Sequence, residues 1–315
     1  MAAVRDPRKA FEQKLVALAK EDQRIFAISC DSASGGGLSS FFSQLPERAV
    51  EVGISEQNAV GIAAAMSRQG LIPVLVVINP FLTMRAFEQV RDDLGYMNSN
   101  VKIVGSGGGL AYSTLGSTHI AIEDVALMRT VPNLTILAPG DAGEVEAALE
   151  RAVEIVGPVY IRMPRQPRGE PAGRDIQRIR HGKAEALTQG DDVALITYGP
   201  SVEEALKAAE LLAAKQIGVT VVDAMTVKPL DTEEIQTHIR GKKAVFTLEE
   251  HIPTGGIGSA VAELMASMQD VPPLYPMGVP EGAKQTGPYE ELLAYYRLDG
   301  ASVATRIWEK LQENT

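Results

Sequence analysis

The sequence predicts an α/β protein in which a mainly parallel sheet is flanked by helices, followed by a second, smaller α/β domain. Short apolar runs typical of buried strands alternate with amphipathic segments at helical spacing along the chain. Residues 72–79 (IPVLVVIN) are continuously apolar, which is typical of parallel strands covered on both faces. The length of 315 residues suggests about two domains.

The composition bounds the class of protein. A hydrophobic content of 45% and a charged content of 22% are ordinary for a globular chain. The net charge of -10 argues against a nucleic-acid partner, which needs a basic surface. It leaves anionic substrates open, because one local arginine can outweigh a distant negative balance. The single cysteine, Cys30, excludes an internal disulfide and is expected to be a buried structural thiol.

The ends and the hydropathy of the chain predict a cytoplasmic location. Residues 1–15 contain no apolar signal core, and no apolar run is long enough to span a membrane. We therefore expect no membrane partner.

The first domain is predicted over residues 1–166. A first helix at 8–20 has Phe11, Leu15 and Leu18 at helical spacing. The apolar runs predict strands at 24–30, 72–79, 101–105, 134–137 and 159–163. Further helices are predicted at 57–66, 81–96, 120–129 and 142–156, and Gly- and Ser-rich loops at 31–40 and 107–119.

Residues 167–191 are rich in Pro, Gly and charge and are predicted to be a linker. The second domain is predicted over 192–315. Its strands are expected at 193–198, 219–223, 244–249 and near Leu274. Its helices are expected at 202–215, 232–240, 258–267, 289–296 and 301–312.

The stretch VEVGISEQNAVGIAAAM, residues 50–66, joins a short apolar run to a helix rich in Ala. Ser55 is predicted to cap this helix, because its hydroxyl can accept a hydrogen bond from an unpaired backbone N–H. Glu56 then lies in the first turn, where the helix dipole favours an acid. Position alone makes Glu56 an ordinary helix-start residue.

Four unusual polar residues follow predicted strands: Asp31, Glu56, His119 and Arg165. Ligands of open parallel α/β sheets bind at the carboxyl ends of the strands, so these residues are candidates for one site. Each also has an ordinary interpretation. A lone loop histidine is commonly a surface residue, and an arginine that opens a charged segment is commonly solvated. None of the other three histidines has metal-ligand spacing with His119, so no metal-binding residues are predicted.

Familiar short motifs are missing. Gly35, Gly36 and Gly37 allow close backbone approach to a ligand or simply form a flexible loop. Their spacing is not G-x-G-x-x-G, which disfavours a nicotinamide-binding oxidoreductase. The sequence contains neither a G-x-S-x-G elbow nor a phosphate-binding G-x-x-x-x-G-K-[ST] loop.

Four segments together resemble the second half of transketolase. They are VGISEQNAVGIAAAM, NPFLTMRAFEQVRDD, LGSTHIAIEDVALMRTVPNLTILAPGD and GPVYIRMPRQ. Their order, spacing and strand–helix context agree over essentially the whole chain. The resemblance is strongest to the split type, in which two chains share what is one polypeptide elsewhere. 1-Deoxyxylulose-5-phosphate synthases and the β subunits of 2-oxoacid dehydrogenases share the plan.

The resemblance implies a thiamine diphosphate enzyme, with a pyrimidine-binding domain followed by the transketolase C-terminal domain. Glu56 matches the family glutamate that bonds N1′ of the aminopyrimidine. A carboxylate there favours protonation of the ring, which helps the cofactor lose its reactive proton and attack a donor ketose. In the family, aromatic side chains pack around the pyrimidine; Phe81 and Phe87 fit, and Met84 stands where another aromatic is usual. Asp31 matches an acid near the cofactor.

Donor recognition is implied to be altered. His119 matches the family histidine near the donor oxygens, and Arg165 matches the arginine that holds a substrate phosphate. Transketolases usually carry an aspartate four residues before that histidine, but this chain has Leu115. They also have a histidine earlier in the loop, where this chain has Gly107. Cofactor activation thus looks intact while the sugar site differs.

The family binds the diphosphate and Mg²⁺ through a GDG motif and a later Asn on a separate domain. This chain has no GDG; Gly190-Asp191-Asp192 lacks the closing glycine. The resemblance therefore implies an α subunit that carries GDG and holds most of the Mg²⁺ site, in an α₂β₂ complex with the cofactor between subunits.

The leading hypothesis is the β subunit of a thiamine-dependent two-carbon (ketol) transferase with a ketose donor. Leu115 and Gly107 leave open a relative of the 2-oxoacid dehydrogenase β subunits, or acyl transfer to a carrier protein. A third alternative is a non-catalytic scaffold subunit, against which the retained Glu56 argues.

Overall fold

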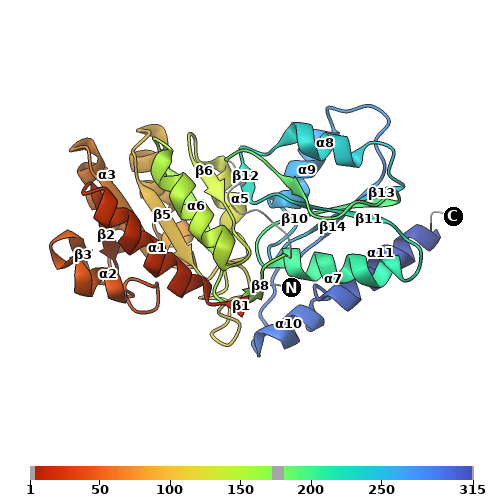
Figure 1. Cartoon of the computed structure of the whole chain (residues 1–315), viewed down its shortest axis with the longest axis horizontal. Helices are drawn as coiled ribbons and strands as arrows, with labels where there is room; N and C mark the ends of the chain where they lie inside the picture. Colours follow the sequence, from red (N-terminus) through yellow and green to blue (C-terminus); the bar gives the residue numbers. More distant parts are fainter. Residues whose placement is uncertain (1–3, 172–180, 314–315) are drawn as a thin grey trace.

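Two mainly parallel sheets form the framework of the chain, one in each half of the molecule (Figure 1). The computed structural model describes residues 4–171 and 181–313. Helices lie against both sheets, so the predicted α/β fold with parallel sheets is confirmed.

The first half alternates strands and helices. Its strands are β1 (Val4–Arg5), β2 (Ile25–Ser29), β3 (Ala49–Glu51), β4 (Ile72–Ile78), β5 (Lys102–Ser106), β6 (Thr135–Leu137), β7 (Val159–Met163) and β8 (Arg168–Gly169). Its regular helices are α1 (Pro7–Glu21), α2 (Ser39–Gln44), α3 (Glu56–Arg68), α4 (Phe87–Gln89), α5 (Asp124–Thr130) and α6 (Ala142–Glu154). Shorter or wider turns are the 3₁₀ turn η1 (Pro46–Arg48) and the π-helical segments η2 (Phe81–Arg85) and η3 (Val90–Tyr96).

The second half repeats the alternation. Its strands are β9 (Glu185–Ala186), β10 (Val193–Thr197), β11 (Val219–Asp223), β12 (Thr226–Lys228), β13 (Ala244–Leu248) and β14 (Leu274–Met277). Its helices are α7 (Ser201–Ala213), α8 (Thr232–Ile239), α9 (Ile257–Met265), α10 (Tyr289–Tyr295) and α11 (Gly300–Glu313).

The first sheet has the order β12-β6-β7-β5-β4-β2-β3, and all neighbours are parallel except β12 and β6. Its strands are buried on both faces. Along β4, Val74 and Val76 pack with α1 and α6, whereas Leu75 and Val77 pack with α3 and α5. Successive side chains point to opposite faces of the sheet, and both faces are covered by helices. The strand is therefore apolar at every position.

The second sheet has the order β14-β13-β10-β11-β9, with only β9 antiparallel to its neighbour. The two halves share one core, because Ile196 of β10 and Val261 of α9 belong to the same buried cluster as Leu75 of β4. Strand β12, from the second half, also extends the first sheet through β6. The two halves are therefore packed against each other through a common hydrophobic core.

The segment predicted as a linker contacts both halves at its ends. β8 pairs with β1, and β9 pairs with β11. Residues 172–180 of that segment lie outside the described residues. The domain limits 1–166 and 192–315 stay predictions.

The helix predicted at 81–96 differs from the structure. Wide π-type turns, η2 and η3, flank the single regular turn α4. The Thr83 hydroxyl donates to the Asn79 carbonyl four residues earlier, at 2.9 Å, and so competes with a regular helical bond. Wide turns of this kind are frequent at functional sites.

The helix predicted at 120–129 begins later, at Asp124. Gly109 and Ala121 exchange backbone hydrogen bonds of 2.9 and 3.0 Å. This isolated bridge keeps the chain out of helical conformation up to that point, and it ties the start of the 107–119 loop to its end.

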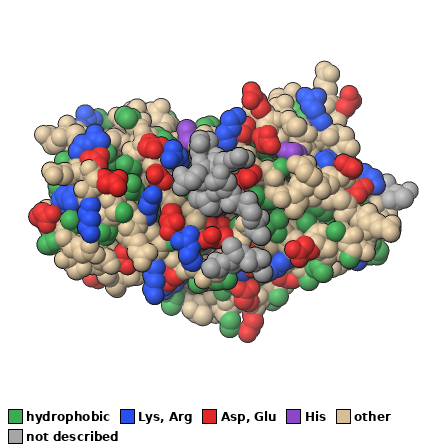
Figure 2. Space-filling view, in the orientation of Figure 1, with side chains coloured by type: hydrophobic (Ala, Val, Ile, Leu, Met, Phe, Trp, Pro, Cys, Tyr) green, Lys and Arg blue, Asp and Glu red, His purple; other side chains and the backbone are tan. Residues whose placement is uncertain are grey.

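The surface shown in Figure 2 mixes both signs of charge. Lys and Arg side chains are interspersed with Asp and Glu across this face, without a large field of one sign. Among the described helices, none combines the length and apolar character needed to cross a bilayer.

Candidate active site

The carboxyl ends of β2, β3, β5 and β7 lie at one edge of the first sheet, because these strands run parallel. Asp31 follows β2, Glu56 follows β3, and Arg165 follows β7. His119 lies at the end of the long loop that leaves β5. The structure thus carries all four predicted residues to the same edge, and side-chain contacts link three of them.

Glu56 is the first residue of α3 and only 2% exposed. Its Oε2 accepts a hydrogen bond from Arg85 Nη1 at 2.9 Å. Its other oxygen, Oε1, has no hydrogen-bond donor among the described residues. A buried carboxylate with one open acceptor is poised to receive a donor from a ligand.

Ser55 occupies the predicted N-cap position, but the predicted side-chain cap is wrong. Its hydroxyl donates to the Val52 carbonyl at 2.9 Å instead of accepting from the helix. With φ -148° and ψ 61°, the residue directs its side chain back to the preceding turn.

Phe81 lies between Arg85, the partner of Glu56, and His119. The Arg85 guanidinium lies over the Phe81 ring, with Cζ 4.2 Å from its centroid. On the other side, the Phe81 and His119 rings meet edge to face, with centroids 5.2 Å apart. Phe87 is half-buried against the core, and Met84 is 37% exposed. Of the three predicted packing residues, Phe81 makes a ring contact with another predicted site residue, His119.

Tyr112 continues this row of contacts. Its ring lies 5.9 Å from that of His119, centroid to centroid. Arg165 stacks on the same ring at 4.6 Å and donates from Nη1 to the Tyr112 hydroxyl at 3.1 Å. Glu56, Arg85, Phe81, His119, Tyr112 and Arg165 therefore form one row of touching side chains, called the site row below.

Sequence reasoning missed Arg85 and Tyr112. Arg85 follows Phe81 by four residues, a spacing that places two side chains on one helical face, so a signal was present. Tyr112 lies inside a loop without periodicity. Its contacts depend on how that loop returns across the sheet, and the sequence carries no signal of them.

Asp31 lies apart from the site row. It is exposed and has a positive φ of 53°. Its backbone N–H donates to Glu51 Oε1 at 2.7 Å, which fixes the turn after β2. The neighbouring Cys30 is buried, as predicted. Burial, together with the charge of Glu56, raises the pKa of its thiol to about 12, so the thiol is inert at neutral pH.

The second half of the chain holds the His119 loop in place. The Leu110 N–H donates to Glu250 Oε2 at 3.0 Å, and the Tyr289 hydroxyl donates to the other oxygen of Glu250. Leu110, Ile120 and Ile122 are buried in the core of the second half. The loop is Gly- and Ser-rich, yet anchored by both apolar burial and a buried acid.

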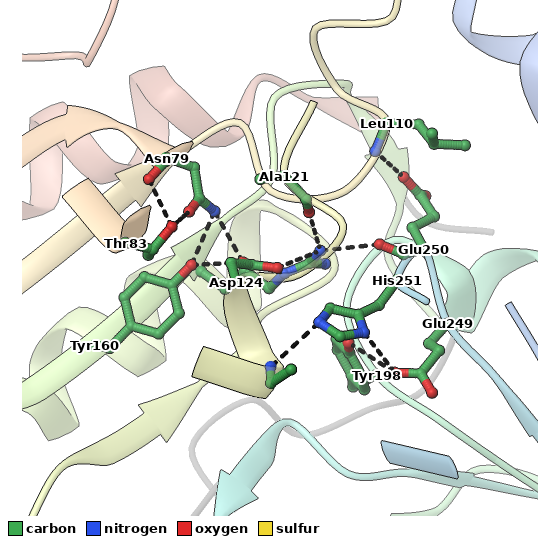
Figure 3. Close-up of polar contacts among 12 residues, drawn as sticks. Asn79, Thr83, Leu110, Ala121, Asp124, Tyr160, Tyr198, Glu249, Glu250 and His251 are labelled. Carbon is green, nitrogen blue, oxygen red and sulfur yellow. Dashed lines mark hydrogen bonds and ion pairs between the residues drawn. The ribbon is translucent and has the colours of Figure 1, made fainter. Parts of the chain in front are cut away.

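A buried network joins the two halves beneath this edge (Figure 3). Arg162 bonds both oxygens of Asp124, at 2.8 and 3.1 Å, and both side chains are almost fully buried. Burial alone would lower the pKa of Arg162, but the Asp124 carboxylate keeps it raised. Arg162 also donates to the carbonyls of Ala121 and Glu250, at 3.0 and 2.9 Å. One arginine thus ties β7, α5, the site loop and the second half together.

His251 lies in the same network in its neutral form. Its Nδ1–H donates to the Ile252 carbonyl at 2.5 Å, and its Nε2 accepts the Ala126 N–H at 3.2 Å. These partners require one protonated and one free ring nitrogen. Burial lowers the pKa of His251 to about 4. The imidazole is therefore a structural clamp between α5 and the second half.

No cluster of three or more His, Cys, Asp or Glu residues suited to hold a metal ion occurs in residues 4–171 and 181–313.

Comparison with known proteins identifies the family of this arrangement. The family model for the transketolase pyrimidine-binding domain matches residues 4–169, and the model for the transketolase C-terminal domain matches residues 182–303. The chain belongs to the transketolase family. The family prediction is therefore confirmed, and the site row lies in the part of the chain that corresponds to the pyrimidine-binding domain, with its loop held by the C-terminal one.

Two relatives of this transketolase-family chain are named as separate transketolase subunits. It is 35% identical to an apulose-4-phosphate transketolase subunit of Phocaeicola vulgatus, over 96% of each chain. It is 36% identical to a 6-deoxy-6-sulfo-D-fructose transketolase subunit of a Clostridium species, over 84% of this chain and 82% of that one. A solved structure of a split-gene transketolase, an inactive β4 tetramer, superposes with a TM-score of 0.89 at 35% identity and covers 98% of both chains.

Proposed function

We propose that this chain is the β subunit of a split, thiamine diphosphate-dependent ketol transferase. The observation that carries the proposal is Glu56: a buried carboxylate in the first turn of α3, with one open oxygen, beside an aromatic row that leads to His119. In the transketolase family this pattern serves cofactor activation, and the two family models match residues 4–169 and 182–303 of the chain.

The residues present fit the aminopyrimidine half of the cofactor. The open Oε1 of Glu56 would accept a hydrogen bond from protonated N1′, and the neighbouring Arg85 supports the carboxylate from its other side. Phe81, which carries the Arg85 guanidinium on its ring, would supply apolar surface beside the pyrimidine. When bound, the cofactor supplies the electron sink for the carbanion left by C–C cleavage.

His119 and Arg165 would face the donor sugar. His119 lies between the Phe81 and Tyr112 rings and is only half-buried, so its imidazole is held in place yet accessible to donor oxygens. Arg165 has no carboxylate partner among the described residues, which leaves its charge available to an anionic group. Asp31, Met84 and Phe87 remain predicted cofactor contacts.

The diphosphate and most of the Mg²⁺ site would come from a partner. The chain lacks a GDG motif, and relatives that it covers almost completely are named as subunits. The similar split-gene β chain forms a tetramer described as inactive. We infer an α₂β₂ complex in which this chain supplies Glu56 and the partner α subunit supplies the diphosphate site, in the cytoplasm.

The donor is proposed to differ from that of standard transketolases. Leu115 replaces the usual donor-binding aspartate and is 54% exposed on the loop. The relatives' names refer to an apulose phosphate and a sulfo-sugar, so substrates vary among similar chains. A 2-oxoacid donor, with transfer to a carrier, is the alternative that the same two departures, Leu115 and Gly107, favour.

Reconstitution with an α chain that carries GDG tests the proposal. Thiamine diphosphate and Mg²⁺ should bind tightly to the mixed complex and at most weakly to this chain alone, measured by calorimetry. The complex should then transfer two carbons from a ketose phosphate faster than it consumes pyruvate. Tight Mg²⁺-dependent binding to the isolated chain contradicts the split-enzyme model, and turnover of pyruvate alone favours the 2-oxoacid alternative.

A further inference from the structure

We propose that Tyr112 is a positioning residue that sets donor selectivity, by holding the Arg165 guanidinium on the same ring that contacts His119. The inference rests on the proposed function and deepens it. It concerns donors that carry an anionic group at the end remote from the reacting carbonyl.

Tyr112 fills space that a side chain at position 107 would need. A Cβ built on Gly107 would lie 2.3 Å from Tyr112 Cε2 and 2.6 Å from Cδ2. Gly107 also has a φ of +79°, which side-chain-bearing residues rarely adopt. The ring at 112 and a side chain at 107 therefore exclude each other in this arrangement, and this chain has the ring.

The ring is placed between two functional groups. One of its contacts is to the His119 imidazole, at 5.9 Å and an interplanar angle of 62°. The other is to Arg165, through both stacking at 4.6 Å and the hydroxyl bond of 3.1 Å. A planar guanidinium held in two ways loses less freedom when it binds a ligand, so the tyrosine prepares Arg165 for an anion.

The loop itself is fixed, so the position of Tyr112 is defined. The neighbouring Leu110 is anchored to Glu250, and the Gln166 side chain donates to the Ala111 carbonyl at 2.9 Å. Gln166 adjoins Arg165, so the same pair of segments is joined through backbone and side chain. Tyr112 therefore fixes the position of Arg165, which follows β7, relative to the loop.

The chain offers a matched control. Tyr96 also stacks with an arginine, Arg91, at 4.8 Å, and accepts a hydrogen bond from its Nη2 at 3.3 Å. It is exposed and lies outside the site row. Tyr96→Phe removes the same hydroxyl from the same kind of pair.

The test uses the complex saturated with cofactor, with a ketose phosphate and the same ketose without its phosphate as donors. Tyr112→Phe should raise KM for the phosphorylated donor about 3- to 10-fold, the effect of one lost hydrogen bond. It should change kcat and the KM of the unphosphorylated donor much less, since the remote anion is held equally in the ground state and the transition state. Tyr112→Ala should raise the same KM further and lower kcat, because His119 loses its neighbour. Tyr96→Phe should change none of these values.

Calorimetric titration with inorganic phosphate gives a second readout that needs no turnover. Phosphate binding that is lost in Arg165→Ala is assigned to this site. Tyr112→Phe should weaken that binding about 3- to 10-fold, whereas Tyr96→Phe should leave it unchanged. Equal KM values and equal phosphate affinities in Tyr112→Phe and Tyr96→Phe overturn the inference. Phosphate binding that Arg165→Ala leaves intact also overturns it. A wild-type complex without turnover of any donor refutes the proposed function instead, and the phosphate titration still decides the role of Tyr112.

Discussion

Gly107 and Gly70 have nearly the same backbone conformation, with φ of +79° and +82°, but different surroundings. Nothing lies within 4 Å of a Cβ built on Gly70, whereas the Tyr112 ring blocks one on Gly107. Gly70→Ala should therefore cost only the left-handed strain of about 1–2 kcal/mol. Gly107→Ala should cost about 1–3 kcal/mol more, because it also overpacks the ring.

Urea unfolding of the two variants measures this difference. The double variant Gly107→Ala with Tyr112→Ala should be less destabilised than the sum of its single changes, because removal of the ring relieves the clash. Equal stabilities of Gly107→Ala and Gly70→Ala contradict the placement of Tyr112 over Gly107.

At the residue scale, the sequence predicted the residues that follow strands and missed the residues that connect them. Glu56, His119 and Arg165 each follow a strand of one parallel sheet, and their common edge follows from that topology alone. Tyr112 bridges two of them through a loop whose path depends on Glu250, far along the chain. Such a contact has no local signal, so only the structure reveals it.

The α5 helix and strand β7 depend on the buried pair Asp124–Arg162, whose side chains are 0% and 2% exposed. Arg162→Met leaves Asp124 buried without its partner and frees two carbonyls, so it should destabilise the chain by about 3–5 kcal/mol. Arg151→Met, which removes a surface pair with Glu154 on α6, should cost about 1 kcal/mol or less. Thermal unfolding of both variants makes the comparison, and similar losses would contradict a structural role for the network.

His251, which joins α5 to the second half, makes the free energy of unfolding depend on pH. Its pKa is lowered to about 4 in the folded chain, against about 6.5 in an unfolded one. The unfolded chain therefore takes up a proton first as pH falls. The stability contributed by His251 is fully present above about pH 6.5 and is lost progressively toward pH 4.

His251→Gln removes this titration. The variant should be destabilised at pH 7, and its deficit relative to wild type should shrink by about 2 kcal/mol by pH 4.5. Glu249 lies 3.9 Å from His251 and titrates with the opposite trend, because burial raises its pKa to about 7, so the comparison is made in a Glu249→Gln background. His238→Gln on α8 is the control for replacing a histidine by glutamine. If the stability deficit of His251→Gln stays constant from pH 7 to pH 4.5, His251 is not a neutral, buried imidazole.

At the scale of elements, period and composition predicted most strands and helices, and tertiary contacts decided the exceptions. The Thr83–Asn79 bond competes with regular helical bonds at the wide turn η2, and the Gly109–Ala121 bridge delays α5. Strand β12 was not predicted, because three residues show too little periodicity to distinguish a strand from a loop.

At the scale of the whole molecule, the two halves have different tasks around one edge. The first sheet presents Glu56, Phe81 and Arg165, while the second half fixes the loop that brings in Tyr112 and His119. The proposal adds a third contributor, the partner subunit, which completes the cofactor site. This division explains why a chain with a retained glutamate and no GDG motif is expected to act only in a complex.

The most direct test is two-carbon transfer by the reconstituted complex carrying Glu56→Gln. The amide preserves shape but cannot act as the carboxylate at N1′, so turnover should fall about 100- to 10,000-fold while the complex still assembles. Glu21→Gln, at the exposed end of α1, is the matched acid-to-amide control and should retain wild-type turnover. If the Glu56→Gln complex transfers two carbons at the wild-type rate, this chain does not activate the cofactor, and the central claim is wrong.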